Sequence, residues 1–443
     1  MRRHFNHPSR AVALLFLSLI AVGTALLMLP AARAEVGSAP WLTALFTAVS
    51  AVCVTGLVVV DTGSYWSPFG QVVVMALFQL GGFGLMTAAA LLGLSVNRSL
   101  RLRTRLLTQA ENHAVGLGDV TGVARVVLVV TALCELLLTA VLALRFQAAY
   151  GMPWGEALWS GLFHAVSAFN NAGFSLYGDS LMRFQADAWV LVPVMLGIVI
   201  GGIGFPVLQD IRGRWRDPRH WSLHTKLTLT GSVVLLLGGL LCLLVFEWSN
   251  PRTLGPMGLA DKLLNAAFAS VSARTAGFNA IDIGALSHES WALHYLLMFI
   301  GGGSAGTAGG VKVTTAAVLL LLVIAEVRGR PDSEAFGRRV CQPAQRQAIT
   351  VLVLGSALVV LGSLVILRVS DLPTDQVIFE VISAFGTVGL STGITANLPP
   401  AGQLMLVLLM YAGRVGTITL ATSLALGERR MPWRLPEEHP IVG

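Results

Sequence analysis

Charged side chains are scarce in this chain of 443 residues. Only 12% of the residues are Asp, Glu, Lys or Arg, against about 25% in a typical soluble domain, while 55% are hydrophobic. So few charged groups cannot cover the surface of a soluble protein. The composition therefore excludes an ordinary soluble domain, and we expect lipid to surround most of the chain.

Cysteine is also rare, and its spacing indicates no site. The four cysteines form neither a CxxC pair nor a metal-ligand pattern: Cys53, Cys134, Cys242 and Cys341. A membrane-bound enzyme would need a cluster of intramembrane His, Asp, Glu or Cys side chains. The motifs described below offer mainly backbone instead, so we expect no enzyme and no organic cofactor.

Long hydrophobic runs are what the sequence has in abundance. Eight of them are long enough to cross about 30 Å of hydrocarbon as helices. They lie near residues 11–30, 71–95, 122–144, 187–208, 227–246, 291–325, 347–367 and 402–425. The first run has no charge over its length, so we interpret it as a retained span rather than a cleaved signal peptide.

Four shorter, half-apolar segments separate pairs of these runs. They lie near residues 40–52, 155–169, 260–273 and 375–385. Each is too short to span a membrane and fits a re-entrant helix better. The order long, short, long therefore occurs four times.

The basic residues follow the same order. Twenty of the 30 lysines and arginines lie at the N-terminus and in the segments 96–120, 211–226, 326–346 and 426–443. Basic segments beside membrane helices remain in the cytoplasm, so both termini are expected inside, with an even number of spans. Membrane topology thus explains the net charge of +7, and membrane lipids rather than nucleic acid are the expected partners.

The four short segments repeat one motif. Each has a Phe, then Ser-Ala, then a glycine followed by a bulky apolar residue. The copies cover residues 46–57, 163–174, 268–278 and 379–390. One such glycine alone would be interpreted as an ordinary helix end, but four matched copies indicate a shared role.

This motif has the properties of a cation filter. A cation without its water needs oxygen ligands, which backbone carbonyls supply wherever buried chain is not helical. Glycine reaches positive φ without a Cβ clash, so it can turn those carbonyls toward a pore axis. The predicted filter, with K⁺ as the bound ion, consists of Val54, Thr55, Gly56, Asn171, Ala172, Gly173, Thr275, Ala276, Gly277, Thr387, Val388 and Gly389.

A second glycine-rich feature lies in the long run after each motif. The copies at 81–84 and 201–204 are expected to pack helices closely. The third copy, 301–312, has six glycines in its first ten residues, which predicts an unwound loop below the filter that gates the path. In the fourth copy Arg414 lies in an apolar run, where a charge is costly and usually functional.

The predicted gate residues are Gly303, Ser304, Gly306, Thr307, Gly309, Gly310, Lys312 and Arg414. For Lys312 two interpretations stay open, because it either acts with Arg414 or marks the cytoplasmic end of the loop. Glu135 is also intramembrane, and the sequence assigns it no role.

These motifs resemble the Trk/Ktr/HKT superfamily of potassium transporters, and its KtrB branch closely, over nearly the whole chain. Besides the four glycines and the loop, segments 413–416 and 436–443 carry the resemblance. The resemblance implies an all-α membrane protein with four helix–pore helix–helix repeats around one central pore. Eight transmembrane helices and four re-entrant pore segments are expected.

The resemblance also implies partners and an ion. It implies a homodimer and a cytoplasmic KtrA-type ring that binds nucleotides. Plant relatives with serine at the first filter favour sodium, so Gly56 supports potassium. Sodium stimulation is known in the family, but no Na⁺ site can be assigned here. Arg274, beside the third filter, departs from the expected pattern, and a structural ion pair with an acid such as Asp282 is its expected role.

We therefore expect gated K⁺ uptake across a bacterial plasma (inner) membrane. The repeats are expected at 1–95, 96–210, 211–326 with the gate loop, and 327–443 with a cytoplasmic tail. The alternative is a secondary transporter of another small cation or solute. That class predicts two inverted halves, whereas this sequence has four parallel copies.

Overall fold

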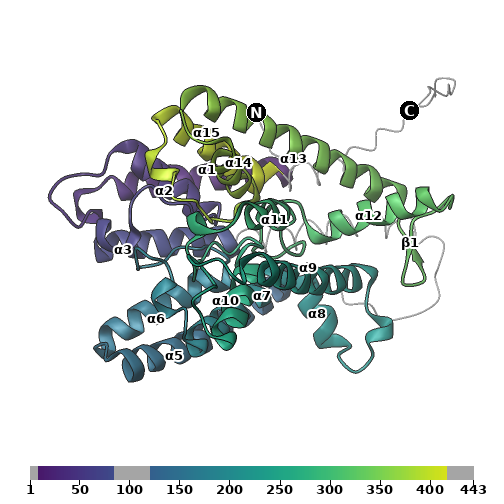
Figure 1. The fold of residues 1–443 in the computed structure, drawn as a ribbon, viewed down its shortest axis with the longest axis horizontal. Coiled ribbons are helices and arrows are strands. Elements are labelled where there is room, and N and C mark those ends of the chain that lie inside the picture. Colours follow the sequence, from purple (N-terminus) through teal and green to yellow (C-terminus); the bar gives the residue numbers. More distant parts are fainter. Residues whose placement is uncertain (1–7, 84–119, 417–443) are drawn as a thin grey trace.

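A computed structural model describes residues 8–83 and 120–416 (Figure 1). Within these ranges the chain is mostly helical, and the only sheet is a hairpin of β1 (Glu334–Ala335) and β2 (Arg338–Arg339). The ends of the predicted runs 71–95 and 402–425 lie outside the described residues. The same is true of most of segment 96–120 and of the whole tail 426–443.

The described helices follow the predicted order in four units. The first contains α1 (Pro8–Leu27), α2 (Trp41–Val52), α3 (Thr62–Tyr65) and a helix over Pro68–Phe83. The second contains α5 (Val120–Tyr150), α6 (Trp154–Phe169), α7 (Ala188–Ile203) and α8 (Phe205–Gly213). The third contains α9 (Leu223–Glu247), α10 (Leu259–Ser272), α11 (His288–Phe299) and α12 (Val313–Val327). The fourth contains α13 (Gln342–Val369), α14 (Thr374–Gly386) and α15 (Pro400–Tyr411).

The short helices α2, α6, α10 and α14 begin and end within one residue of the predicted segments. Their motif phenylalanines, each at most 1% exposed, are Phe46, Phe163, Phe268 and Phe379. These buried rings fix the short helices in the core. In Figure 1, α2 and α14 lie above α6 and α10, and the segments that follow the four helices meet between them.

Two of the predicted long runs are not continuous helices: 187–208 is bent, and 291–325 is divided into α11 and α12 by the predicted loop. Among the described residues, α5, α9 and α13 are each long and apolar enough to cross a membrane. Helices α7 and α8 meet this condition only together, and the chain bends by 92° between them. The predicted continuous run 187–208 is therefore wrong beyond Ile203. Gly204 lies at the bend with φ +98°. A Cβ there would overlap the carbonyl oxygen of Ser304, so only glycine fits at this position.

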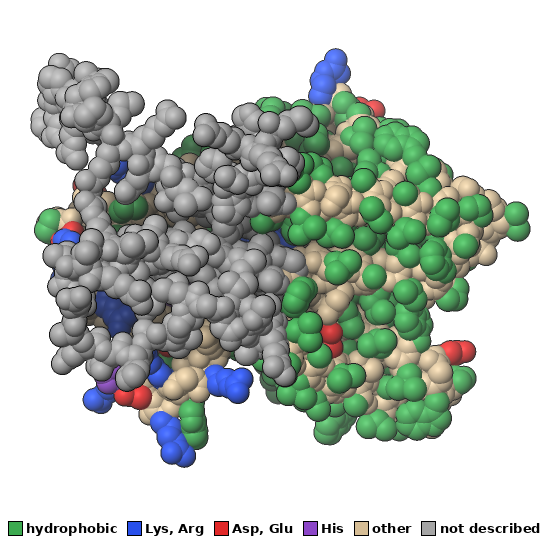
Figure 2. Space-filling model, turned by 180° about the vertical axis from the view of Figure 1, so that it is seen from behind, with side chains coloured by type: hydrophobic (Ala, Val, Ile, Leu, Met, Phe, Trp, Pro, Cys, Tyr) green, Lys and Arg blue, Asp and Glu red, His purple; other side chains and the backbone are tan. Residues whose placement is uncertain are grey.

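Large hydrophobic side chains point outward along the long helices. Leu136 on α5, Val234 on α9 and Leu364 on α13 are 65%, 63% and 60% exposed. Figure 2 shows hydrophobic side chains over most of the described surface at the right of that view, with most visible Lys and Arg toward the other end. A surface this apolar is suited to lipid rather than to water.

Candidate functional site

The four predicted filter glycines meet in a closed ring. Each glycine lies against the backbone of the next segment in the chain, and the last lies against the first. A Cβ on Gly56, Gly173, Gly277 or Gly389 would meet the carbonyl oxygen of Ala172, Ala276, Val388 or Thr55, respectively. The structure therefore brings all four segments together around one axis, and a side chain has no room at these positions.

The backbone of the ring is not helical. Positive φ angles of 56°, 57°, 72° and 48° occur at Val54, Asn171, Thr275 and Thr387, and angles of 90°, 69°, 79° and 95° at the glycines two residues later. A residue other than glycine in this region costs on the order of 1–3 kcal/mol. Four repeats of the same costly conformation indicate that the surrounding packing imposes it. Such a backbone leaves carbonyl oxygens available to a cation, as a helix does not.

The serine of the motif holds each filter segment against its own short helix. The carbonyl oxygens of Ser50, Ser167, Ser272 and Ser383 accept bonds of 2.7–3.0 Å from the N–H groups of Thr55, Ala172, Ala276 and Val388. All four serines are buried. Sequence reasoning found the serines but assigned them no function. Their fixed position in all four copies was the available signal.

The serine hydroxyls act in two opposite ways. Those of Ser50 and Ser383 accept from the N–H groups of Gly56 and Gly389, both at 3.1 Å. In the other two repeats the hydroxyl donates instead, from Ser167 to Phe174 O (2.8 Å) and from Ser272 to Phe278 O. Repeats one and three, which lie opposite each other in the ring, therefore differ in the direction of this hydrogen bond, and so do repeats two and four.

Three filter hydroxyls are buried without a hydrogen-bond partner among the described residues. They belong to Thr55, Thr275 and Thr387. Buried polar atoms are nearly always paired, so unpaired hydroxyl oxygens at a site predicted to bind a cation are informative. Together with carbonyls they would supply the oxygen-only ligand set that hard cations prefer, but a cation site here stays a prediction.

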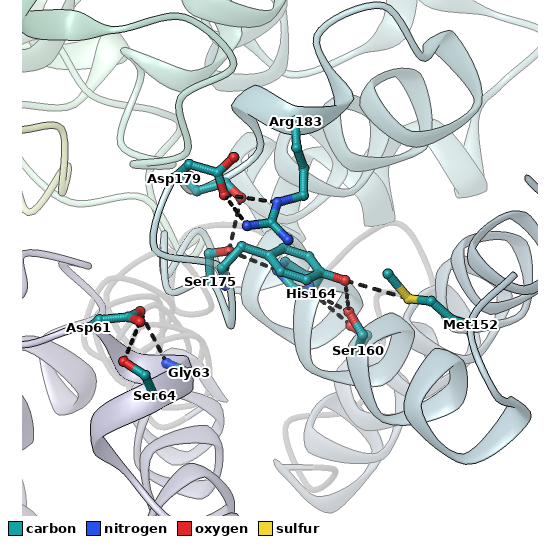
Figure 3. Close-up of polar contacts among 11 residues, drawn as sticks. Asp61, Gly63, Ser64, Met152, Ser160, His164, Ser175, Asp179 and Arg183 are labelled. Carbon is teal, nitrogen blue, oxygen red and sulfur yellow. Dashed lines mark hydrogen bonds and ion pairs between the residues drawn. The ribbon is translucent and has the colours of Figure 1, made fainter. Parts of the chain in front are cut away.

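A cavity of about 250 Å³ opens on one side of the ring, and we name it the mouth. All four ring glycines line it, with Asp61, Tyr177, Asn279 and Thr395 among the other lining residues. The Asp61 carboxylate accepts from Gly63 N (3.2 Å) and Ser64 Oγ (2.6 Å) (Figure 3). The mouth is therefore rich in oxygen and includes a carboxylate.

Two buried polar side chains hold the chain as it leaves filters two and four. Both follow the motif Phe directly, and both bind the serine two residues after the glycine. His164 Nε2 lies 3.0 Å from Ser175 Oγ (Figure 3), and the Glu380 carboxylate accepts from Ser391 Oγ and from Thr395 Oγ1 at 3.0 Å. Sequence reasoning missed this pair, because the position after the Phe differs among the four copies.

The segment 300–312 is a loop between α11 and α12, so the predicted unwinding is confirmed. Its two ends pair with each other. Gly301 N–H donates to Val311 O (2.8 Å), and Val311 N–H donates to Phe299 O (3.2 Å). We name these paired ends, residues 299–302 and 311–313, the neck.

Two cations hold the far part of the loop. Lys312 Nζ lies 2.5 Å from Ala308 O and 3.3 Å from Gly309 O, and Arg414 Nη1 donates to Thr307 O. Arg414 is only 1% exposed. Carbonyls of three successive residues, 307–309, therefore bind fixed positive charges, and we name this stretch the tip.

The loop lies directly beneath the ring, on the side away from the mouth. A Cβ on Gly309 would overlap the Thr387 side chain of filter four, and Ser304 Oγ lies 2.9 Å from Thr314 Oγ1 on α12. Beneath the ring the structure thus assembles Gly303, Ser304, Gly306, Thr307, Gly309, Gly310, Lys312 and Arg414. The role of this layer as a gate stays a prediction.

Other glycines lie against the ends of the short helices. A Cβ on Gly81, Gly201 or Gly413 would overlap the carbonyl oxygen of Val52, Phe169 or Phe385, respectively. The close packing predicted for the first two glycine clusters is confirmed, and it brings these carbonyls beneath the ring. The partial negative charge at a helix C-terminus stabilises a cation there.

Glu135, which the sequence left without a role, belongs to a buried polar cluster behind filter two. Its carboxylate accepts from Gln79 Nε2 and Asn170 Nδ2, each at 3.2 Å. Asn170 is the C-cap of α6 and directly precedes the filter residue Asn171. The cluster joins the first repeat to the second at the base of a filter.

The predicted ion pair between Arg274 and Asp282 is wrong. Asp282 caps its own turn by accepting from Gly284 N at 2.9 Å. Arg274 instead donates to Ser232 and Gly301. The third filter passes between the two residues, so that Arg274 faces the loop while Asp282 lies in the segment that follows the filter.

Comparisons with known proteins agree with this architecture. The family model of TrkH, described as a cation transport protein, matches residues 2–433. Among solved structures, the potassium transporter TrkH from Vibrio parahaemolyticus aligns with a TM-score of 0.70 and 19% identity, covering 98% of this chain and 87% of that chain. At this identity the likeness shows the fold alone.

Two curated relatives are similar over almost their whole length. The Ktr system potassium uptake protein B of Bacillus subtilis (strain 168) is 41% identical over 422 residues, covering 95% of this chain and 94% of the relative. The potassium/sodium uptake protein NtpJ of Enterococcus hirae is 36% identical over 445 residues, covering 98% and 97%.

Proposed function

Because this chain belongs to the TrkH family of cation transport proteins, and to the KtrB type within it, we propose that it mediates potassium uptake. The observation that carries the proposal is the closed ring of four glycines. A ring without side chains exposes backbone carbonyls to one axis, which is the ligand set that a dehydrated K⁺ requires. The family consists of ion transporters rather than enzymes.

We propose that K⁺ enters from the mouth and meets the loop 301–312 as a gate. The mouth would face outward, because Ser304 of the loop and Arg339 of the basic segment 326–346 line one cavity on the opposite side. Arg414 and Lys312 at the tip would oppose a passing cation by repulsion. Both termini would be cytoplasmic, in a bacterial plasma membrane.

Partners form a further part of this proposal. The name of the Bacillus subtilis relative makes it one component of a Ktr system. We propose for this chain a homodimer on a cytoplasmic KtrA-type ring that binds nucleotides. The name of the Enterococcus hirae relative includes sodium, which supports testing Na⁺ both as an activator and as a transported ion.

We also propose the boundaries of the four repeats. They lie at 95/96, 210/211 and 326/327, the first of which is outside the described residues.

Uptake of ⁸⁶Rb⁺ into liposomes that contain the purified protein tests the function. We expect uptake that K⁺ inhibits strongly and that Na⁺ and Li⁺ inhibit weakly. Inhibition by Na⁺ as strong as that by K⁺ would contradict a K⁺-selective ring. Uptake that occurs only with an opposing gradient of a second ion would indicate a secondary transporter instead.

A further inference from the structure

The residue three positions before the glycine differs among the four filters. It is, in chain order, Cys53, Asn170, Arg274 and Gly386. Only the third copy has a charged side chain, and that side chain is 8% exposed. Burying a guanidinium is costly unless its N–H groups find acceptors. The two Nη groups of Arg274 have acceptors, whereas Nε has none among the described residues. Its partners therefore show what it holds in place.

Arg274 joins three parts of the third repeat. Nη1 lies 3.4 Å from Ser232 O on α9, and Nη2 lies 3.3 Å from Ser232 Oγ. Nη2 also donates to Gly301 O at 3.2 Å. The next residue in the chain is Thr275, a filter residue with φ +72°. One side chain thus connects a filter segment, a long helix and the first residues of the loop.

Its loop contact falls on the neck rather than on the tip. Gly301 N–H is bonded to Val311 O at 2.8 Å, and Val313 N–H is bonded to Gly302 O at 3.0 Å. A Cβ on Gly301 would lie 3.2 Å from Thr275 Cγ2, so the neck also packs against the filter itself. The tip, by contrast, is held by Lys312 and by Arg414 from the fourth repeat.

We propose that Arg274 is a positioning residue that couples the third filter to the neck of the loop. The proposal rests on the proposed function, since it assumes that the ring binds K⁺ and that the loop opens. When the loop moves, the bond to Gly301 transmits the displacement to the peptide of Thr275. We take the ring geometry in this structure, which occurs together with the closed loop, as the geometry that binds K⁺. By reciprocity, a cation bound at the ring then favours the closed loop, and losing the bond uncouples the two sites.

The coupling can be measured by thiol labelling at the loop. Ser304 is partly exposed and lines a cavity of about 430 Å³ on the loop side, so a thiol at this position can be reached from water. Cys341 lines the same cavity and is exposed, so the background variant is Cys341→Ser. The reporter is Ser304→Cys, labelled by a charged maleimide in detergent with either K⁺ or choline as the cation.

We expect saturating K⁺ to slow labelling by at least about fivefold in the reporter, the lower end of typical allosteric coupling. Arg274→Met should bring the ratio of labelling rates near one, and Arg274→Lys should restore part of it. Arg145→Met is the control, because Arg145 on α5 pairs with Asp187 at 2.8 Å and, among the described residues, lines neither the mouth nor the cavity beside the loop. It should keep the full K⁺ effect.

Two measurements separate the possible failures. Thermal stabilisation of each variant by K⁺ reports whether the protein is folded and still binds the ion. Arg274→Gln replaces the methionine variant if that variant does not fold. An unchanged K⁺ effect on labelling in Arg274→Met, or no K⁺ effect in a reporter that transports ⁸⁶Rb⁺, overturns the coupling. A reporter that neither transports ⁸⁶Rb⁺ nor is stabilised by K⁺ overturns the proposed function itself.

Discussion

The ring of filter segments draws on all four repeats, whereas the loop beneath it comes from the third repeat alone. In the ring, each segment has positive φ angles at the same two positions, and each has an equivalent backbone bond to its own serine carbonyl. The loop has no such symmetry, because its own Lys312 and arginines from the third and fourth repeats hold it. Ion choice should therefore depend on features shared by all repeats. Closure of the pore by the loop should depend on contacts that only one repeat makes.

The largest effect is expected from breaking the ring. A side chain at Gly277 would meet Val388 O and lie 3.1 Å from Gly173 Cα, at a backbone with φ +79°. Gly277→Ser should therefore lower the preference for Rb⁺ over Na⁺ at least about tenfold, equivalent to 1.4 kcal/mol. Gly56→Ser should act in the same direction, since its position in the ring is equivalent. Competition in the liposome assay measures both.

Gly151→Ser is the control for this experiment, because Gly151 follows α5 and does not line the mouth. Gly151 has φ +66°, yet a Cβ there would meet nothing within 4 Å. The substitution applies the same backbone strain outside the ring. If it changed selectivity as much as Gly277→Ser, strain rather than the ring would determine ion choice.

A different result is expected from shortening the loop. Deleting residues 304–309 removes the tip but leaves Gly301 and Val311, whose bond closes the neck. If the loop blocks the pore for about four-fifths of the time, ⁸⁶Rb⁺ flux should rise about fivefold. The Rb⁺ to Na⁺ preference should stay close to that of the intact chain, because the ring is untouched. Flux at the original level in a folded deletion variant would count against the gate.

A smaller effect is expected from one serine of the ring. Ser383→Ala leaves the Gly389 N–H without the acceptor that now lies at 3.1 Å. An unpaired buried donor costs about 1–3 kcal/mol, so the melting temperature and the Rb⁺ preference should both fall modestly. Ser363→Ala on α13 is the control, since that hydroxyl only donates to Val359 O within its own helix. If both variants lost Rb⁺ preference equally, the Ser383 hydroxyl would have no specific part in selectivity.

Local features of the sequence predicted the order of the helices. The features that the sequence did not predict depend mainly on contacts between residues far apart in the chain. The four short helices follow from their motif and length, and the loop follows from the helix-breaking effect of its glycines. The bend between α7 and α8 was missed, although Gly204 and Pro206 are local signals for a helix break. The close approach of the Ser304 carbonyl, which restricts position 204 to glycine, comes from a segment a hundred residues away. The partners of Arg274 were missed because they too lie far away in the sequence. The nearest acid in the sequence, Asp282, lies beyond the filter, while the real acceptors belong to α9 and the neck.

The smallest effect is expected behind the second filter, at Glu135. Glu135→Gln removes the ionisable group but keeps an oxygen that can accept from Asn170 or Gln79. Asn170 also keeps its bonds of 2.5 Å to Gln79 Oε1 and 2.9 Å to Val166 O. Flux should therefore change by less than about twofold, with Rb⁺ selectivity unchanged.

Glu135→Leu sharpens this test, because it leaves Gln79 Nε2 without its acceptor and removes one of the three acceptors of Asn170 Nδ2. It should therefore lower the melting temperature further. If Glu135→Gln disturbed selectivity as strongly as Gly277→Ser, the carboxyl group behind filter two would be part of the conduction path. The ring would then need a support that only one repeat supplies. Selectivity of the ring, like closure of the loop, would then depend on a residue that occurs in one repeat alone, although the backbone of the ring repeats four times.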